Sequence, residues 1–399
     1  MYYPKIEEQK NNKYLTKGLT FILALAAGVS VANLYYNQPL LIEIAKAFQI
    51  TSREAGFLST LTQLGYAAGV FLFVPLGDIK EKRKLILTLI ALVTVSLLGV
   101  ATAQNLSWLY FCCFAVGLTT GIPQIIIPLA AQLADPKERG KVIGTIVSAA
   151  LIGVLSARTV AGYIGYLAGW RFVFVFAAIL MGILGIVLYF KLPVTKSYEN
   201  LTYKELIKSL LSITQKYSAL RKASITGAMM FGAFSVFWTT LTFLLESPTY
   251  NMNVNQVGLF GLFGVVGALG ARIIGRLNDK KDSKIIIIIC IITCIIAYII
   301  LSFFSFNVFG IILGVIILDF GIQGSQVSNQ TIIYSLSGDD ERSRINTVFI
   351  VSNFIGGAIG SSLGSLAWSL YNWSGVCVVG SAMILIAFVV NLFGIRQKN

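Results

Sequence analysis

Apolar segments of about 20 residues follow one another along the whole chain. An α-helix of that length crosses the hydrocarbon core of a bilayer, which is about 30 Å thick. Runs such as residues 285–289 are continuously apolar, whereas the strands of a membrane barrel would alternate. The sequence therefore predicts an all-α membrane protein with helices near residues 18–40, 52–76, 85–103, 107–133, 142–166, 169–190, 222–246, 256–276, 285–304, 307–335, 345–370 and 374–395.

The composition supports a lipid environment. The chain has 399 residues, of which 56% are hydrophobic and 12% charged. A soluble protein of this size does not bury so much apolar surface. The five cysteines all fall inside predicted helices, where they behave as small apolar residues, so we expect neither a disulfide framework nor a metal site.

The net charge of +14 raises the question of nucleic-acid binding, and the positions of the basic residues answer it. Of the 31 lysines and arginines, all but Lys46, Arg53, Arg158 and Arg171 lie in the terminal tails or at alternate helix ends. By the positive-inside rule these ends face the cytoplasm, which predicts that both termini are cytoplasmic. We therefore expect a lipid bilayer and no nucleic acid as partner.

An internal duplication divides the predicted helices into two sets of six. The stretch Pro75-Leu-Gly-Asp-Ile-Lys-Glu-Lys-Arg-Lys84 returns as Gly275-Arg-Leu-Asn-Asp-Lys-Lys-Asp-Ser-Lys284, which puts Asp78 and Asp279 201 positions apart. We predict two pseudo-symmetric six-helix bundles and five regions: a cytoplasmic tail (1–17), an N-terminal bundle (18–190), a cytoplasmic linker (191–221), a C-terminal bundle (222–395) and a second cytoplasmic tail (396–399). In the linker, Leu206, Leu210 and Ile213 recur at helical spacing, which predicts an amphipathic helix on the inner leaflet.

Polar side chains inside the segments mark helix faces that do not meet lipid. Asn33, Tyr36 and Asn37 share one face of the first predicted helix, at i, i+3 and i+4. They line a substrate cavity or bond a neighbouring helix, and the spacing does not separate these alternatives. Segments 85–103, 169–190, 285–304 and 374–395 are the least polar, so we expect them to face lipid while the other eight surround a central cavity. The predicted cavity residues are Asn33, Tyr36, Asn37, Gln63, Gln124, Arg158, Trp238 and Gln323.

Arg158 and Asp319 are the charges predicted deepest in the membrane. Counting along the helices places Asp319 about 17 Å from the outer end, near the midplane, and Arg158 roughly 10 Å nearer the outside. We therefore expect no permanent ion pair between them. Desolvation favours a protonated carboxyl, which suits Asp319 to proton coupling, and the permanent charge of Arg158 suits the outer part of the transport route. A structural hydrogen bond is the alternative role for each residue.

The charged stretches and the end of the first helix resemble those of a known family. Asn33-Leu-Tyr-Tyr-Asn-Gln-Pro39, Pro75-Leu-Gly-Asp78 and Gly169-Trp-Arg171 are similar to motifs of the major facilitator superfamily, in its bacterial drug:proton antiporter-type subgroup. The resemblance implies two halves that rock about a central site and a cytoplasmic gate at the charged stretches. One departure is Ala157-Arg158, where the antiporter motif has Gly-Pro. The predicted gate residues are Asp78, Lys82, Arg83, Gly275 and Asp279.

The resemblance and the residues together predict a secondary active transporter. The first hypothesis is proton-driven efflux of a small organic molecule or drug by a monomer in the bacterial inner (plasma) membrane. The second is import or exchange of an organic anion, because Arg158 replaces the antiporter element. An embedded enzyme is the third. The chain has no histidine, no Walker-type loop and no readable nucleophile–base pair, so we expect no enzyme, cofactor or metal.

Overall fold

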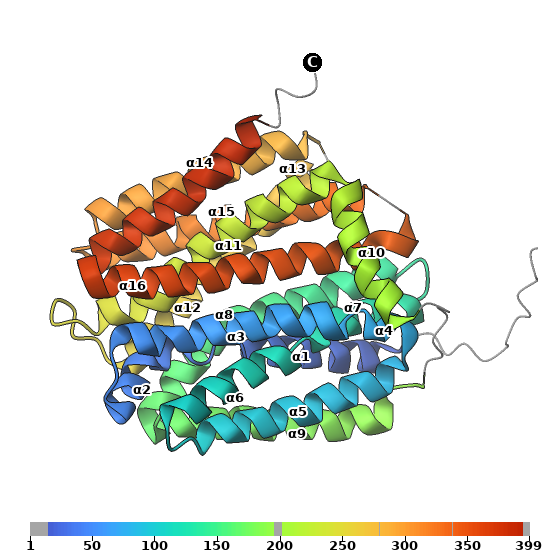
Figure 1. Cartoon of the computed structure of the whole chain (residues 1–399), viewed down its shortest axis with the longest axis horizontal. Helices are drawn as coiled ribbons and strands as arrows, with labels where there is room; N and C mark the ends of the chain where they lie inside the picture. The colour runs from blue at the N-terminus through green and yellow to red at the C-terminus, as the bar shows by residue number, and fades with distance from the viewer. Residues whose placement is uncertain (1–14, 195–201, 279, 337, 394–399) are drawn as a thin grey trace, which may run out of the picture.

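The computed structural model describes residues 15–194, 202–278, 280–336 and 338–393, and all secondary structure in these residues is helical (Figure 1). The elements are α1 (Lys17–Ala32), η1 (Gln38–Leu40), α2 (Leu41–Phe48), α3 (Ser52–Phe73), α4 (Leu76–Ile79), α5 (Lys82–Ala101), α6 (Leu106–Thr119), α7 (Ile122–Leu133), α8 (Arg139–Ala168), α9 (Trp170–Lys191), α10 (Tyr203–Lys216), α11 (Ser218–Leu245), α12 (Val254–Leu269), α13 (Ala271–Asn278), α14 (Ser283–Phe303), α15 (Val308–Tyr334) and α16 (Asp339–Phe393).

Nine helical stretches in the described residues are long and apolar enough to cross a membrane. The last of them, Glu341–Leu392, contains two crossings, because the helix folds back at Asn372, which has a φ of 51°. Asparagine adopts positive φ more readily than most residues. Counting this stretch as two crossings and adding the shorter apolar helices α1 and α12 gives the twelve crossings that the sequence predicts.

The first crossing ends earlier than predicted. The N–H groups of Asn33, Leu34 and Tyr35 donate to carbonyls three residues back, so α-helical hydrogen bonding stops at Ala32. Pro39 explains the change, because a proline has no N–H and its ring clashes with the carbonyl four residues earlier. The shared face that an unbroken helix would give to Asn33, Tyr36 and Asn37 is therefore lost.

The fourth crossing is also broken, between α6 and α7. Thr119 ends α6, and Pro123 lies in the first turn of α7, where its missing N–H is harmless. The crossing is therefore interrupted at Thr120 and Gly121. Backbone groups freed by such a break need partners inside the protein, and the Thr120 hydroxyl donates to the Val116 carbonyl.

The helices form two groups that meet along two lines of contact. Helices α1 to α9 gather on one side of the molecule and α11 to α16 on the other (Figure 1). We call the contact of α3 with α16 the α3–α16 seam and that of α8 with α12 the α8–α12 seam. Helices α5, α9 and α14 carry exposed apolar side chains, including Val95, Ile186 and Ile299, as expected of lipid-facing helices. Helix α8 also exposes a large apolar residue, Ile152.

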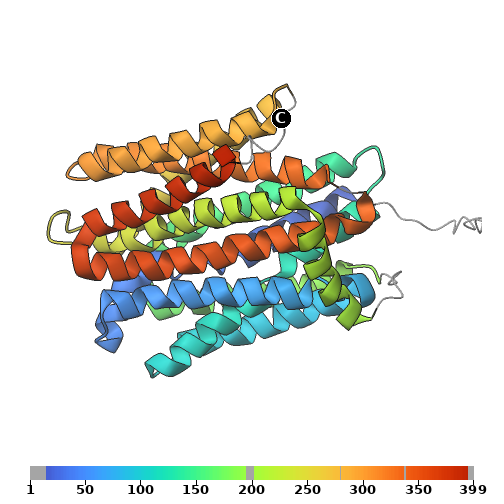
Figure 2. The same ribbon diagram turned by 45° about the horizontal axis from the view of Figure 1, so that its top comes forward.

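Helix α10 crosses the ends of the other helices instead of lying apart from them (Figures 1 and 2). We call this end of the molecule, which also carries α4 and α13, the inner end, and the opposite end, which carries η1 and α2, the outer end. Leu206, Leu210 and Ile213 are buried against protein, with α16 as a main partner of α10. The prediction that this apolar face lies on the inner leaflet is therefore wrong, because α16 covers it.

Candidate functional site

Arg158 is the largest fully buried side chain of the described residues and lies on α8. Its Nε donates to Gln38 Oε1 at 2.8 Å, and its Nη1 donates to the Val154 carbonyl at 3.3 Å. The guanidinium carbon lies 3.9 Å from the centre of the Trp238 ring, and Tyr35 and Phe234 are further aromatic neighbours.

These contacts explain how the protein tolerates the buried charge of Arg158. A buried cation costs about 2.5–3.5 kcal/mol on insertion scales. A desolvated cation–π contact returns about 2 kcal/mol, and a hydrogen bond from a charged group about 1.5–3 kcal/mol. The contacts of Arg158 with Trp238 and Gln38 are therefore sufficient to offset the cost of burying its charge.

Asp319 lies on α15 on another side of the same tryptophan. Trp238 Nε1 donates to Asp319 Oδ1 at 3.4 Å, and the carboxyl group is 1% exposed. Asp319 Oδ2 and Arg158 Nη2 are buried without a hydrogen-bond partner among the described residues. Helix counting placed the two charges at different depths, but the structure puts both side chains against one indole, because long side chains reach along the helix axes.

A row of glycines on α12 makes room for this group. Every third residue of α12 from Gly258 to Gly267 is glycine, and Gly270 directly after the helix continues the row. A Cβ on Gly264 would lie 2.6 Å from Asp319 Oδ2 and 3.2 Å from the Trp238 ring, and a Cβ on Gly261 would lie 3.1 Å from Arg158 Cβ. The three-residue spacing of these glycines is a readable sequence signal of close helix packing, and the predicted site residues do not include them.

A cavity of about 10 Å³ adjoins Arg158 and Trp238, with Gln38 and Thr242 also in its wall. This volume is close to the smallest that holds one water molecule. The sequence predicts a central cavity for a substrate, and this structure has the predicted centre packed nearly closed.

The predicted cavity residues of the first crossing have different surroundings. Asn37 donates to Thr62 and accepts from Ser59, both on α3, so its amide joins two crossings of the same half. Asn33 is buried, and neither of its side-chain polar atoms has a partner among the described residues. Tyr36 is buried as well, but it is Tyr35 that lies over Arg158. Tyr35 and Gln38 are therefore site residues that the helical-face argument missed.

Two of the predicted glutamines connect the two halves. Gln63 Nε2 donates to Ser361 at 3.1 Å, and Ser235 donates to Gln63 Oε1 at 3.3 Å. Gln124 Nε2 donates to Tyr66 at 3.2 Å, while Asn346 of α16 donates to Gln124 Oε1 at 3.5 Å. Gln323 is partly buried on α15. Neutral amides thus bridge the halves on the α3–α16 side of the molecule.

The outer end holds a second cluster of charges. Lys46 of α2 lies 3.9 Å from the carboxylate of Glu246, the residue after α11, and this ion pair joins the two halves. The Glu246 side chain is only 8% exposed, whereas that of Lys46 is 76% exposed. Burial raises the pKa of Glu246 to about 7 against the lowering effect of Lys46, and it also raises the pKa of nearby Glu43.

The predicted gate residues lie at the inner end. Asp78 is on α4, and Gly275 is on α13, where an added Cβ would meet nothing within 4 Å. Lys82 donates to Gln132 and Arg83 to the Tyr189 carbonyl, so both bind helices of their own half. Asp279 lies outside the described residues. Nothing in these contacts tests the gate, which stays a prediction.

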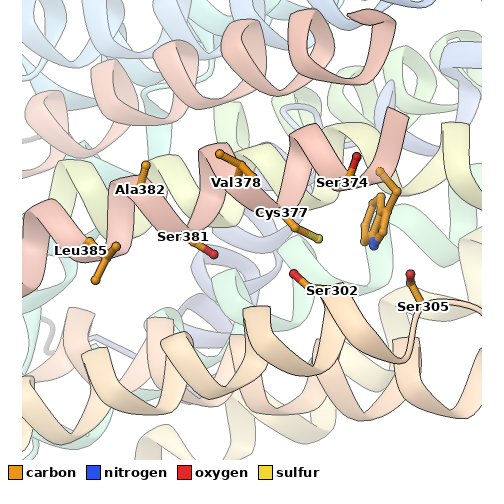
Figure 3. A pocket seen from close by; sticks show the side chains of 9 residues that line it. Ser302, Ser305, Ser374, Cys377, Val378, Ser381, Ala382 and Leu385 are labelled. Carbon is orange, nitrogen blue, oxygen red and sulfur yellow. The ribbon is translucent and has the colours of Figure 1, made fainter. Parts of the chain in front are cut away.

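A second cavity of the described residues lies away from this group. It is a groove of about 620 Å³ between α14 and the second crossing of α16, two helices predicted to face lipid (Figure 3). The hydroxyl groups of Ser302 and Ser305 point toward α16, and Cys377 and Ser381 lie opposite them (Figure 3). None of the predicted cavity residues lines this groove.

Comparison with known proteins identifies the class. The sequence profile of the Major Facilitator Superfamily matches residues 23–331 and 223–399. The uncharacterized transporter YgaY of Escherichia coli O157:H7 is 40% identical over 390 residues, which cover 98% of this chain and 99% of YgaY. The chain belongs to the major facilitator superfamily, and it is a secondary transporter and not an enzyme.

Solved structures agree on the fold. A POT family transporter in complex with a thioalcohol-conjugated peptide superimposes with a TM-score of 0.78 at 14% identity, covering 96% of each chain. A bacterial homolog of the human lysosomal transporter Spinster, in an inward-facing and occupied conformation, gives 0.74 at 13% identity, covering 95% of this chain and 96% of its own. The predicted twelve-helix architecture of a multi-pass integral membrane protein is confirmed.

Proposed function

We propose that the protein exports a small organic molecule or drug across the bacterial inner membrane, driven by proton influx, with Asp319 as the coupling group. The observation that carries the proposal is the group formed by Arg158, Trp238 and Asp319. It lies where both halves meet, so a change in the charge of the Asp319 carboxyl group affects helices of both halves.

The chemistry of Asp319 supports its coupling role. Its only hydrogen bond among the described residues comes from Trp238, and Arg158 stacks on the same ring instead of pairing with the carboxylate. An ionised carboxylate in such surroundings is costly, and protonation removes that cost. Proton binding is therefore linked to whether water reaches the site, which is what coupling by alternating access requires.

The assignment to the drug:proton antiporter subgroup is part of the proposal and rests on the motifs at the end of the first helix and at Pro75-Leu-Gly-Asp78. The monomeric state and the cytoplasmic placement of both termini belong to it as well. In this arrangement, Asp78, Lys82, Arg83, Gly275 and Asp279 form the cytoplasmic gate. The cavity residues would bind the substrate when the halves move apart.

The test begins with the unknown substrate. Intracellular metabolites and drug susceptibility are compared in cells with and without the protein, and a compound that accumulates in its absence is the candidate. Proteoliposomes with an imposed pH gradient then measure its transport. Export that requires the gradient supports the proposal, whereas equal transport with and without a gradient contradicts proton coupling.

A second candidate is exchange of organic anions, and one observation favours it. Arg158 Nη2 is a buried donor without a partner among the described residues, and a substrate carboxylate would satisfy it. In the same proteoliposomes, exchange stimulated by an anionic substrate on the opposite side, without a pH gradient, favours this candidate.

A further inference from the structure

Glu246 is a carboxyl group whose surroundings depend on whether the outer ends of the two halves touch. It follows α11, in the second half, while its ion-pair partner Lys46 lies on α2, in the first half. Thr242, one turn earlier, donates to Glu246 Oε1 at 3.4 Å and also lines the small cavity beside Arg158. The carboxyl group thus lies between the outer surface and the central charged group.

The outer end is closed in this structure. Thr159 of α8 donates to the Gly258 carbonyl of α12 at 2.9 Å, and a Cβ on Gly162 would lie 2.6 Å from the Val254 carbonyl. These contacts hold the halves together on the same side of the molecule as the pair of Lys46 and Glu246. Separation of the outer ends would expose Glu246 to water and remove Lys46 from it.

We propose that Glu246 is a proton-binding group at the outer end, separate from Asp319, and that a proton bound there holds the outer ends of the two halves together. Protonation removes the need to bury a negative charge, which Lys46 compensates only weakly from 3.9 Å while remaining largely in water. The proposal stands whether or not Asp319 couples transport to protons.

The direction of the effect follows from linkage. In the closed arrangement the pKa of Glu246 is about 7, against an ordinary value of 4.5 that water access would restore. The closed state therefore binds the proton more tightly, and proton binding favours closure. The closed state is most favoured at a pH below the ordinary pKa of 4.5 and least favoured at a pH above about 7. Within this window the ratio of closed to open molecules changes by up to about tenfold for each pH unit.

Two further ionisable groups act on Glu246. The negative charge of Glu43 raises its pKa and the positive charge of Lys46 lowers it. Thr242, which donates to Glu246, also lines the small cavity whose wall includes Gln38 and Val257, which do not ionise, and Arg158. Lys46 and Glu43 therefore provide variants that shift the titration without removing the proton-binding group.

The experiment measures the distance across the outer end as a function of pH. Spin labels are attached to cysteines at the exposed positions Ala168 and Thr249, one in each half, in the full-length protein in lipid nanodiscs. The five native cysteines are buried. Electron–electron distance distributions are recorded between about pH 4 and pH 8, which spans the window set by linkage. We expect a short distance at low pH and a growing long-distance population as pH rises toward 8.

The variants decide between proton binding and a passive ion pair. Glu246→Gln should remain closed at every pH, since glutamine resembles the protonated acid. Lys46→Gln should move the transition to higher pH and Glu43→Gln to lower pH. In Asp319→Asn, the part of the response that Lys46→Gln and Glu43→Gln shift should persist, which separates this proposal from the coupling role of Asp319. A wild-type protein without a pH response, or an unchanged response in Glu246→Gln, overturns the proposal. If Glu246→Gln does not fold, Lys46→Gln provides the test. A pH transition in Lys46→Gln at the same pH as in the wild type overturns the proposal as well.

Discussion

The two seams between the halves occupy corresponding places in the duplicated fold, but they are built from different groups. At the α8–α12 seam, backbone meets backbone: a Cβ on Gly258 would lie 2.8 Å from the Arg158 carbonyl. At the α3–α16 seam, side chains meet: a Cβ on Gly56 would meet the Ser365 side chain, and one on Gly357 would meet Gln63 Oε1. Charge is divided in the same way, since Arg158 and Asp319 both lie beside α12 and neutral amides fill the other seam.

This difference indicates where the halves can part. A side chain changes rotamer quickly and at little cost, while two backbones in contact separate only when a whole helix moves. The α3–α16 seam can therefore open and close again by exchanging hydrogen bonds. The α8–α12 seam opens only when whole helices move, as in the proposed separation of the outer ends, and while it is closed it keeps the charged group in place. The following substitutions test this distinction, beginning with the largest expected effect.

Asp319→Asn should abolish gradient-driven transport while substrate binding and counterflow exchange persist. The amide keeps the size of the carboxyl group but cannot take up and release a proton. Gradient-driven uptake and exchange are measured side by side in proteoliposomes. Gln323→Glu, which adds a carboxyl group one turn away, is a matched variant to test whether position matters. Full proton-driven transport by Asp319→Asn would remove its coupling role.

Gly258→Ala should destabilise the protein by about 1–3 kcal/mol, because its methyl group meets backbone that cannot turn aside. The midpoint of thermal unfolding in detergent reports the loss. Gly144→Ala, on α8, is the control, since an added Cβ there meets nothing within 4 Å. Equal midpoints for the two variants would show that the α8–α12 seam is looser than its geometry indicates.

Arg158→Lys should cost about 1–2 kcal/mol despite keeping the charge, because an ammonium group stacks less well on Trp238 and cannot contact Gln38 and Val154 at once. The midpoint of thermal unfolding and the transport rate should both be lower than in the wild type. Arg53→Lys, at an exposed position, serves as the control. Wild-type stability and transport in Arg158→Lys would mean that only the charge matters.

Gln63→Leu should have the smallest effect, about 0.5–1.5 kcal/mol, because it removes hydrogen bonds between side chains that can partly rearrange. Since the amide also joins the halves, we expect a larger change in the transport rate than in the unfolding midpoint. The transport rate and the midpoint of thermal unfolding are measured for this variant as well. A loss of stability as large as that of Gly258→Ala would contradict the distinction between the seams.

Much of the fold follows from the sequence alone, because lipid imposes simple local rules. A helix must supply its own backbone hydrogen bonds in the membrane and needs about 20 apolar residues to cross it. Those rules predict the crossings, and the cost of burying charge identifies Arg158 and Asp319 as exceptional. The match to the superfamily profile confirms the superfamily that the motifs near Asn33 and Pro75 indicate.

Tertiary structure decided the rest. Periodicity along a helix does not reveal that α10 packs on α16 instead of lipid, since both surfaces are apolar. It does not reveal that the first crossing breaks before Pro39, which moves Tyr35 and Gln38 onto Arg158. Depth counted along separate helices cannot show that Arg158 and Asp319 share Trp238, because that contact depends on how far side chains reach and how closely the glycines of α12 let the helices approach.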